Sequence, residues 1–155
     1  MRPMSKTMKI ALFPGSFDPF TKGHEALVLR GLELFDKVVV AVGQNSAKQY
    51  QFPLEERLDA IRRTFDYNTR VQVLHYEDMT VDCCRRCGAQ FILRGVRNAK
   101  DLEYERTVAA VNNALDSGIE TVVLFAEPEM AEVSSTVVRE LLARGKDVKA
   151  YMPNN

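Results

Sequence analysis

Ser16 and His24 lie eight residues apart in the polar segment 14–24, where the sequence passes from a strand pattern to a helix pattern. The apolar run 10–13 precedes this segment, and the helical pattern that follows it begins near Ala26. The first turn of a helix has unpaired N–H groups and carries the positive end of the helix dipole, so it attracts anions. A hydroxyl and an imidazole brought together at such a point are suited to binding and transferring phosphate groups.

Further polar segments follow expected strands, as segment 14–24 does. They contain Lys48, the pair Arg94 and Arg97, and residues 127–136. Ligands of open α/β sheets bind beyond the carboxyl ends of the strands, so we expect all of these segments to open on one rim. A His, a Lys, two Arg and a Ser/Thr-rich helix start on that rim predict a site for phosphorylated substrates.

Apolar, β-branched runs alternate with helical patterns along the chain. The expected strands span residues 8–13, 37–42, 71–74, 91–93 and 121–125. The expected helices span residues 24–35, 53–65, 78–87, 101–115 and 134–144, and the first is expected to turn Leu27, Leu34 and Phe35 inward. Nearly continuous apolar strands indicate a parallel sheet covered on both faces, and right-handed crossovers then give an α/β fold with a doubly wound five-stranded parallel sheet. We expect residues 1–7 to form a flexible extension and residues 8–155 a single domain.

The composition excludes several classes of protein. The chain has 155 residues, of which 46% are hydrophobic, and this suffices for one domain with its own core. Its 21 Lys and Arg balance 21 Asp and Glu, which argues against a nucleic-acid scaffold. No apolar run approaches the length of a membrane span, and the first residues lack the apolar core of a signal peptide. We therefore expect a cytoplasmic protein without nucleic-acid or membrane partners.

The cysteines, Cys83, Cys84 and Cys87, are clustered in one segment, and an odd, clustered set is not a disulfide framework. Cys84 and Cys87 have the spacing of half a zinc or redox motif. No second cysteine pair exists, however, and the only histidines are His24 and His75. We interpret the cysteines as reduced thiols on a short helix and expect no metal site made by protein side chains.

Several segments resemble signatures of known enzymes. TKGH at residues 21–24 resembles the (H/T)xGH signature of the nucleotidyltransferase superfamily. ILRGVR at 92–97 resembles the I-x-R-G-(L/V)-R segment of the bacterial phosphopantetheine adenylyltransferases, and DLEYE at 101–105 resembles their D-(F/L)-E-Y-E motif. VSST at 133–136 is similar to their I-S-S-(S/T) segment, and LEER at 54–57 also fits. The resemblance runs in order along nearly the whole chain.

This resemblance implies a Rossmann-like nucleotidyltransferase fold and a defined reaction. The adenylyl group of ATP is transferred to 4′-phosphopantetheine, which gives dephospho-coenzyme A and pyrophosphate in the penultimate step of coenzyme A biosynthesis. The resemblance also implies Mg²⁺ bound with ATP, a homohexamer, and coenzyme A as a feedback inhibitor. Because Mg²⁺ is commonly held by phosphate oxygens with few protein ligands, we assign it to ATP and name no protein ligand.

The resemblance also assigns roles to single residues, with His24 as the stabiliser of the transition state at the α-phosphate. It implies ATP binding by Ser16, Phe17, His24, Gly95, Val96, Arg97, Glu105, Met130, Ala131, Glu132, Val133, Ser134, Ser135 and Thr136. It implies phosphopantetheine binding by Ser16, Lys48, Thr80 and Arg94, where Thr80 stands in place of the family's usual Met or Leu.

Other functions share part of this pattern. Cytidylyltransferases that act on glycerol phosphate or phosphocholine carry the (H/T)xGH signature, as do nicotinate mononucleotide adenylyltransferases, but the RGVR and DLEYE segments argue against them. A non-catalytic sensor of nucleotides or coenzyme A on the same fold is a different class, because fold alone does not settle activity. Such a sensor could lose His24 or Arg94 and still bind, yet both are present. A plain assembly protein would not need the polar rim.

Overall fold

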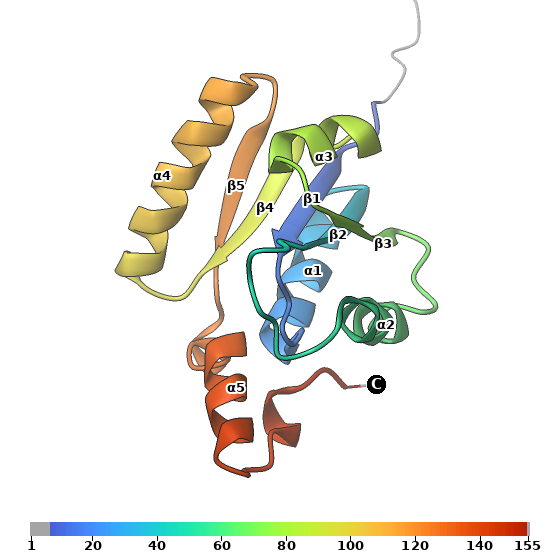
Figure 1. Ribbon diagram of the computed structural model, residues 1–155. Helices are drawn as coiled ribbons and strands as arrows, with labels where there is room; N and C mark the ends of the chain where they lie inside the picture. Colours follow the sequence, from blue (N-terminus) through green and yellow to red (C-terminus); the bar gives the residue numbers. More distant parts are fainter. Residues whose placement is uncertain (1–6, 155) are drawn as a thin grey trace, which may run out of the picture.

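In the computed structural model, which describes residues 7–154, parallel strands form one sheet with helices on both of its faces (Figure 1). The strands are β1 (Ile10–Gly15), β2 (Lys37–Gly43), β3 (Val71–Tyr76), β4 (Phe91–Val96) and β5 (Glu120–Phe125). The α-helices are α1 (Lys22–Leu34), α2 (Leu54–Thr64), α3 (Thr80–Cys87), α4 (Ala99–Leu115) and α5 (Ser135–Ala143). Two 3₁₀ helices, η1 (Pro128–Met130) and η2 (Lys149–Tyr151), complete the described part. The doubly wound α/β fold expected from the sequence is confirmed, while residues 1–6 of the expected extension lie outside the described residues.

The sheet has the strand order β3-β2-β1-β4-β5, so the direction of winding reverses between β1 and β4. β1 pairs with β2 along its whole length, from Ile10 to Gly15. Its register with β4 covers only Ala11 and Leu12, opposite Phe91 and Ile92. Beyond those pairs, the backbone of β1 and that of β4 do not pair with each other, so the facing groups at these strand ends can contact other atoms. A reversal of this kind is where open α/β sheets bind their ligands.

Strand β2 shows why the sheet is covered on both sides. Val38 and Val40 pack in one core cluster with α1 and α2, whereas Val39 and Ala41 pack in a second cluster with α3. All of these side chains are fully buried. Successive strand residues point to opposite faces, so an unbroken apolar run requires two helical layers.

Helix α1 departs from the expected inward face at one position. Leu27 and Phe35 are buried as predicted, but Leu34 is 53% exposed, so the prediction that it turns inward is wrong. The buried stripe of α1 ends at Leu32. Leu34 lies two residues farther on, which is about 200° around the helix and therefore on its outer side.

The loop after β1 is shaped by an aromatic side chain that folds back on it. Phe17 has a φ of 48° and is buried against Phe13 and Phe20. A Cβ atom at Gly15 would lie 2.9 Å from the Phe17 ring, so any larger residue there would force the ring to shift. The left-handed backbone at Phe17 is one of the uncommon conformations that packing must hold in place, and it sets the course of the loop toward α1.

Helix α4 and strand β5 form the least covered edge of the molecule. Within α4 only Glu105 and Asn112 are buried. Large apolar side chains at this edge are exposed, namely Leu102, Tyr104, Val111, Leu115 and Phe125. A concentration of exposed apolar side chains is typical of a surface that contacts another protein.

Helix α3 carries the cysteines. Cys83 and Cys84 are buried in the core cluster of α3, and all three thiols are free. Burial raises the pKa of the Cys84 thiol to about 12, so this thiol stays protonated at neutral pH. The residues 7–154 contain no group of three or more His, Cys, Asp or Glu side chains placed to hold a metal ion. None of the helices among those residues has the length and apolar character needed to cross a membrane.

Candidate active site

Two cavities open at the carboxyl ends of β1 and β4, with volumes of about 590 and 380 Å³. The larger, which we call the α3–α4 cavity, is lined by Thr80 of α3 and Asn112 of α4, among others. The smaller, the α1–α5 cavity, is lined by His24 of α1 and Ser135 of α5, among others. The residues that line both are Pro14, Gly15, Ser16, Arg94, Tyr104 and Glu105. Two bound molecules would therefore meet at this shared wall.

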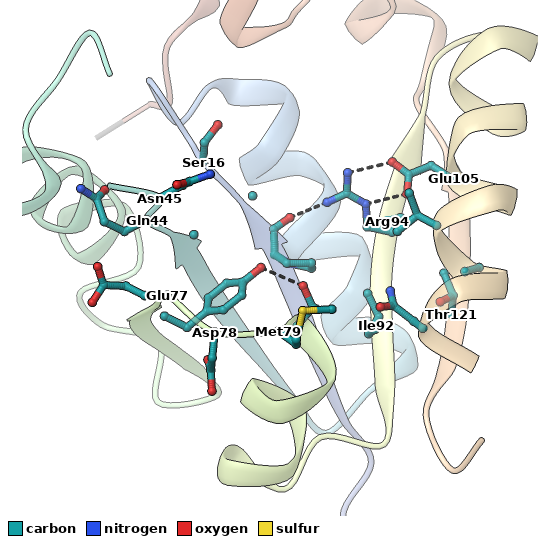
Figure 2. Close-up of a pocket in the computed structure, with 18 of the residues that line it drawn as sticks. Ser16, Gln44, Asn45, Glu77, Asp78, Met79, Ile92, Arg94, Glu105 and Thr121 are labelled. Atoms are coloured by element: carbon teal, nitrogen blue, oxygen red, sulfur yellow. Dashed lines mark hydrogen bonds and ion pairs between the residues drawn. The ribbon is translucent and has the colours of Figure 1, made fainter. Parts of the chain in front are cut away.

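Figure 2 shows how the α3–α4 cavity crosses the rim of the sheet. Ser16 and Asn45 lie on one side of the view, and Ile92 and Thr121 lie on the other. The Arg94 guanidinium lies between Glu105 of α4 and the end of β1. The expectation that polar segments following several strands open on one rim is met by this arrangement.

His24 sits in the first turn of α1 and is fixed by a capping box. The Thr21 hydroxyl accepts the His24 N–H at 3.4 Å, and the Thr21 N–H donates to His24 Nδ1 at 2.9 Å. The ring also packs at centroid distances of 5.0 Å from Phe17 and 5.3 Å from Phe20. Because Nδ1 accepts a backbone N–H, the proton of the neutral imidazole is assigned to Nε2.

The electrostatic surroundings keep this imidazole neutral. Burial lowers the pKa of His24 to about 3, and the positive charges of Arg94 and Arg97 act in the same direction. A charged ring would lose solvation and meet two like charges. His24 therefore presents a neutral N–H donor at the α1–α5 cavity across the physiological pH range.

Arg94 and Glu105 form a two-bond ion pair in the shared wall. Arg94 Nε donates to Glu105 Oε1 at 2.9 Å, and Arg94 Nη2 donates to Oε2 at 2.7 Å. Arg94 Nη1 donates to the carbonyl oxygen of Pro14, at the end of β1 where pairing with β4 has stopped. Glu105 is nearly fully buried, so its charge is satisfied by this pair. One N–H on each terminal nitrogen of Arg94 has no partner among residues 7–154 and is able to meet a phosphate oxygen.

Arg97 and the start of α5 form the outer part of the α1–α5 cavity. Arg97 pairs with Asp101 at 3.2 Å, and the Asp101 carboxylate also accepts the Arg97 N–H at 3.0 Å. Ser134 caps α5 by accepting the Val137 N–H at 3.2 Å. The Ser135 hydroxyl donates to the Pro19 carbonyl at 2.7 Å, which ties α5 to the loop after β1. A helix start and a cation face the same space, an arrangement that favours an anion.

Lys48 and Thr80 both line the α3–α4 cavity, but only the Thr80 side chain has a hydrogen-bond partner among the described residues. Lys48 lies in an exposed loop, and its amine has no ion pair or hydrogen bond among the described residues. Thr80 is the first residue of α3, and its hydroxyl lies 3.0 Å from the Tyr76 hydroxyl. The polar hydroxyl at position 80 is thus engaged by a neighbouring phenol.

Most of the residues predicted for the site line these cavities. Those predicted for phosphopantetheine, Ser16, Lys48, Thr80 and Arg94, all line the α3–α4 cavity. The α1–α5 cavity gathers Ser16, Phe17, His24, Gly95, Arg97, Glu105, Met130, Val133, Ser134, Ser135 and Thr136. Val96, Ala131 and Glu132 do not line either cavity: Val96 is fully buried, and the other two lie in the turn before α5. Their contact with ATP stays a prediction.

Several residues of the site were not found from the sequence. Tyr104 lines both cavities, Asn112 lines the larger one, and Arg57 is buried just behind Ser16. Tyr104 and Arg57 lie inside the DLEYE and LEER segments, so the motifs contained a signal for them. Asn112 had no such signal, because its role depends on which side of α4 faces the cavity.

Comparisons with known proteins agree with this geometry. A family model described as cytidylyltransferase-like matches residues 12–141. The phosphopantetheine adenylyltransferase of Bacteroides fragilis is 48% identical over 146 residues, which cover 94% of this chain and 97% of that protein. The enzyme of the same name from Phocaeicola vulgatus is 49% identical with 94% and 96% coverage, and that of Limosilactobacillus reuteri is 45% identical with 96% and 86% coverage.

Among solved structures, a bifunctional NMN adenylyltransferase/ADP ribose pyrophosphatase from Francisella tularensis matches with a TM-score of 0.71 and 19% identity. The match covers 96% of this chain but only 46% of that protein. The same protein complexed with AMP and a manganese ion matches with a TM-score of 0.69 and 16% identity, covering 96% of this chain and 45% of that one. At these identities the likeness shows the fold alone.

Proposed function

The chain belongs to the phosphopantetheine adenylyltransferase family, and on this premise we propose that it transfers the adenylyl group of ATP to 4′-phosphopantetheine, giving dephospho-coenzyme A and pyrophosphate. The observation that carries the proposal is the meeting of two cavities at Ser16 and Arg94, with His24 beside them. Such a pair of cavities suits a reaction that joins two phosphate-bearing molecules. We also keep the cytoplasm as the proposed location.

In the proposed reaction, ATP occupies the α1–α5 cavity and phosphopantetheine occupies the α3–α4 cavity. A phosphate oxygen of phosphopantetheine attacks the α-phosphorus of ATP in line with the leaving pyrophosphate. One P–O bond forms to the α-phosphorus, and the P–O bond between the α-phosphorus and the pyrophosphate oxygen breaks. The protein acts by positioning the phosphates and stabilising charge, with no covalent enzyme intermediate.

His24 is proposed to stabilise the transition state at the α-phosphate. Its Nδ1 is occupied by the Thr21 N–H, which supports donation from Nε2 toward the cavity. A fixed donor strengthens its hydrogen bond as negative charge develops, and one such donor contributes about 10²–10³ in rate. A neutral donor does this without itself transferring a proton.

Arg94 is proposed to grip the acceptor phosphate, with Glu105 holding the guanidinium in place. The two bonds between them leave the outer N–H groups of Arg94 directed by a buried carboxylate rather than by solvent. This pairing adds a positioning role to the ATP contact that the family resemblance implies for Glu105. Lys48 supplies a second positive charge from its exposed loop, and Thr80 borders the space for the pantetheine arm.

ATP is proposed to arrive with Mg²⁺, which neutralises phosphate charge when bound. The carboxylates that line the α1–α5 cavity near the shared wall fit this assignment, because Glu105 is committed to Arg94 and Asp101 to Arg97. They are not placed as a cage for a cation. Phosphate oxygens of ATP would then be the main ligands of the ion.

We also propose a homohexamer and feedback inhibition by coenzyme A, as the family resemblance implies. The exposed apolar side chains of α4 and β5 support self-association. Light scattering after gel filtration should give six times the 17.6 kDa chain mass. Coenzyme A contains the phosphopantetheine portion of the product, so it should compete with phosphopantetheine in initial-rate assays.

A direct turnover assay tests the function. Purified protein is mixed with Mg²⁺-ATP and 4′-phosphopantetheine, and dephospho-coenzyme A and pyrophosphate are followed by mass spectrometry and a coupled assay. Parallel reactions contain glycerol 3-phosphate with CTP, and nicotinate mononucleotide with ATP. Product only in the first reaction is expected. No product in any reaction, together with measurable ATP binding, would support a sensor instead.

A further inference from the structure

Arg57 of α2 is a buried arginine whose three hydrogen bonds all go to uncharged oxygens. Only 2% of the residue is exposed. Its Nη1 donates to the Ser16 carbonyl at 2.9 Å, its Nε donates to the Phe52 carbonyl at 3.0 Å, and its Nη2 donates to Gln44 Oε1. No carboxylate among residues 7–154 pairs with it. A buried charge held by carbonyl and amide oxygens alone is unusual, because burying an arginine generally requires an acid partner.

These bonds join two segments that line the α3–α4 cavity. Ser16 belongs to the loop after β1, whereas Gln44 begins the 44–52 loop that carries Lys48. The guanidinium carbon also lies 4.1 Å from the centre of the Tyr50 ring, and the Tyr50 hydroxyl accepts the Asn45 N–H at 2.9 Å. Figure 2 shows Ser16, Gln44 and Asn45 gathered on the same side of the cavity. Arg57 therefore contacts Gln44 at the beginning of the 44–52 loop, and Tyr50 and Phe52 near its end.

Asp18, in the loop after β1, also fixes the 44–52 loop. Its carboxylate is buried and accepts the Gln51 N–H at 2.8 Å and the Phe52 N–H at 2.9 Å. Arg139 of α5 in turn donates to the Asp18 carbonyl at 2.9 Å. The loop after β1 and the 44–52 loop are thus joined twice, once through Arg57 and once through Asp18.

We propose that Arg57 and Asp18 are positioning residues for the transfer reaction: they fix the two backbone segments that carry the Ser16 hydroxyl and the Lys48 amine, and so place both groups for the same acceptor phosphate. This inference rests on the proposed function. Neither side chain lines the α3–α4 or the α1–α5 cavity, so both act through the residues they hold. The Lys48 amine has no hydrogen bond or ion pair among the described residues, so its reach to a phosphate depends on the backbone that Arg57 and Asp18 anchor.

The first test substitutes Arg57→Lys, which keeps the charge but cannot bond three separated oxygens. We expect kcat/KM for phosphopantetheine to fall on the order of 10²-fold, since misplacement by about 1 Å has effects of this size. KM for ATP should rise much less, because the 44–52 loop borders only the acceptor cavity and Ser16 is the one held residue that also lines the α1–α5 cavity. Arg63→Lys is the matched control: Arg63 is exposed on the same helix and should leave all constants unchanged.

A double-mutant cycle with Lys48→Ala separates positioning from a general loss of stability. If Arg57 acts through the loop, Lys48→Ala should have a much smaller effect in the Arg57→Lys background than in the wild type. If the fold-change in the double variant equals the product of the two single fold-changes within about twofold, the inference is overturned. Equal losses of affinity for both substrates would also overturn it. Thermal unfolding of each variant shows whether the fold persists.

Asp18→Asn gives a second, independent reading should Arg57→Lys fail to fold. The amide keeps the size of the side chain but offers one oxygen to two N–H donors. The same selective loss for phosphopantetheine, and the same coupling to Lys48→Ala, is expected; unchanged kinetics would overturn the inference. Wild-type protein that makes no dephospho-coenzyme A would remove the proposed function and this inference with it, whereas active wild type with independent effects removes this inference alone.

Discussion

The shared wall of the two cavities and the 44–52 loop hold their charged groups in opposite ways. At the wall, the Arg94 guanidinium is fixed by Glu105, and the neutral His24 ring beside the wall is fixed by the Thr21 N–H. In the loop, Lys48 is exposed, and only the backbone around it is anchored. On the proposed function, this difference predicts that His24 and Arg94 are placed before substrates arrive, whereas Lys48 adapts to the acceptor. Substitution of His24 should therefore affect turnover most, and substitutions of Arg94 and Lys48 should affect acceptor affinity, with the smaller effect at the exposed Lys48.

The largest effect is expected for His24→Ala. Turnover should fall by about 10²–10³-fold while the dissociation constant of ATP changes little, because the contact is mainly to the transition state. Steady-state kinetics and calorimetric titration with ATP measure the two quantities. His75→Ala, an exposed histidine on β3, is the control. Near-normal turnover would remove His24 from the mechanism and leave it only its capping role.

A smaller effect is expected for Arg94→Ala. Loss of a charged hydrogen-bond donor costs about 1.5–3 kcal/mol, so KM for phosphopantetheine should rise by roughly ten- to a hundredfold, and KM for ATP should rise much less. Equal weakening of both substrates would instead make Arg94 part of the general architecture.

Glu105→Gln tests the other half of the same ion pair. This substitution should also weaken the binding of phosphopantetheine. In the Arg94→Ala background it should cause little further loss of affinity, because the carboxylate acts partly through the guanidinium. Undiminished effects of Glu105→Gln in the Arg94→Ala background would separate the two residues and favour a direct ATP contact alone.

Lys48→Ala should change affinity only. We expect KM for phosphopantetheine to rise by up to about tenfold with kcat retained, since an exposed amine contributes a point charge. The effect should shrink as salt is raised, because solvent-exposed charges are screened. Lys146→Ala, at an exposed position after α5, is the matched control. A large loss of kcat would place Lys48 at the reacting phosphorus and erase the contrast with the wall.

The effect of pH is on stability rather than on kinetic constants, and it probes how firmly the fold keeps the His24 ring neutral. The folded pKa of His24 is about 3, below its ordinary value of 6.5, so the unfolded chain binds more protons between these values. Stability that His24 contributes is therefore complete above pH 6.5 and is lost as the pH falls toward 3. At pH 5 the wild type should lose about 2 kcal/mol relative to His24→Asn, measured by denaturant unfolding at pH 7 and pH 5. Equal losses in both proteins would mean that the ring is not held neutral.

The order of the elements and the type of fold could be predicted from residue patterns alone. Continuous runs such as residues 38–42 require cover on both faces, and alternating strands and helices then lead to a parallel sheet. The ends of strands were less predictable. β4 was expected to end at Leu93, yet it continues to Val96, because pairing with β5 extends the ladder through Arg94 and Gly95.

The residues of the site, too, could be predicted from the sequence only where the signal was local. Local spacing identified Ser16, His24 and Arg94, because short motifs at strand ends keep their residues near one another. Contacts between distant segments could not be read in this way. The pairing of Arg94 with Glu105, the neutral state of His24 and the bonds of Arg57 to Ser16 and Gln44 depend on how strands and loops meet in space. Hydrogen bonding and burial act over a few ångströms whatever the separation along the chain, so these features exist only once the sheet has formed.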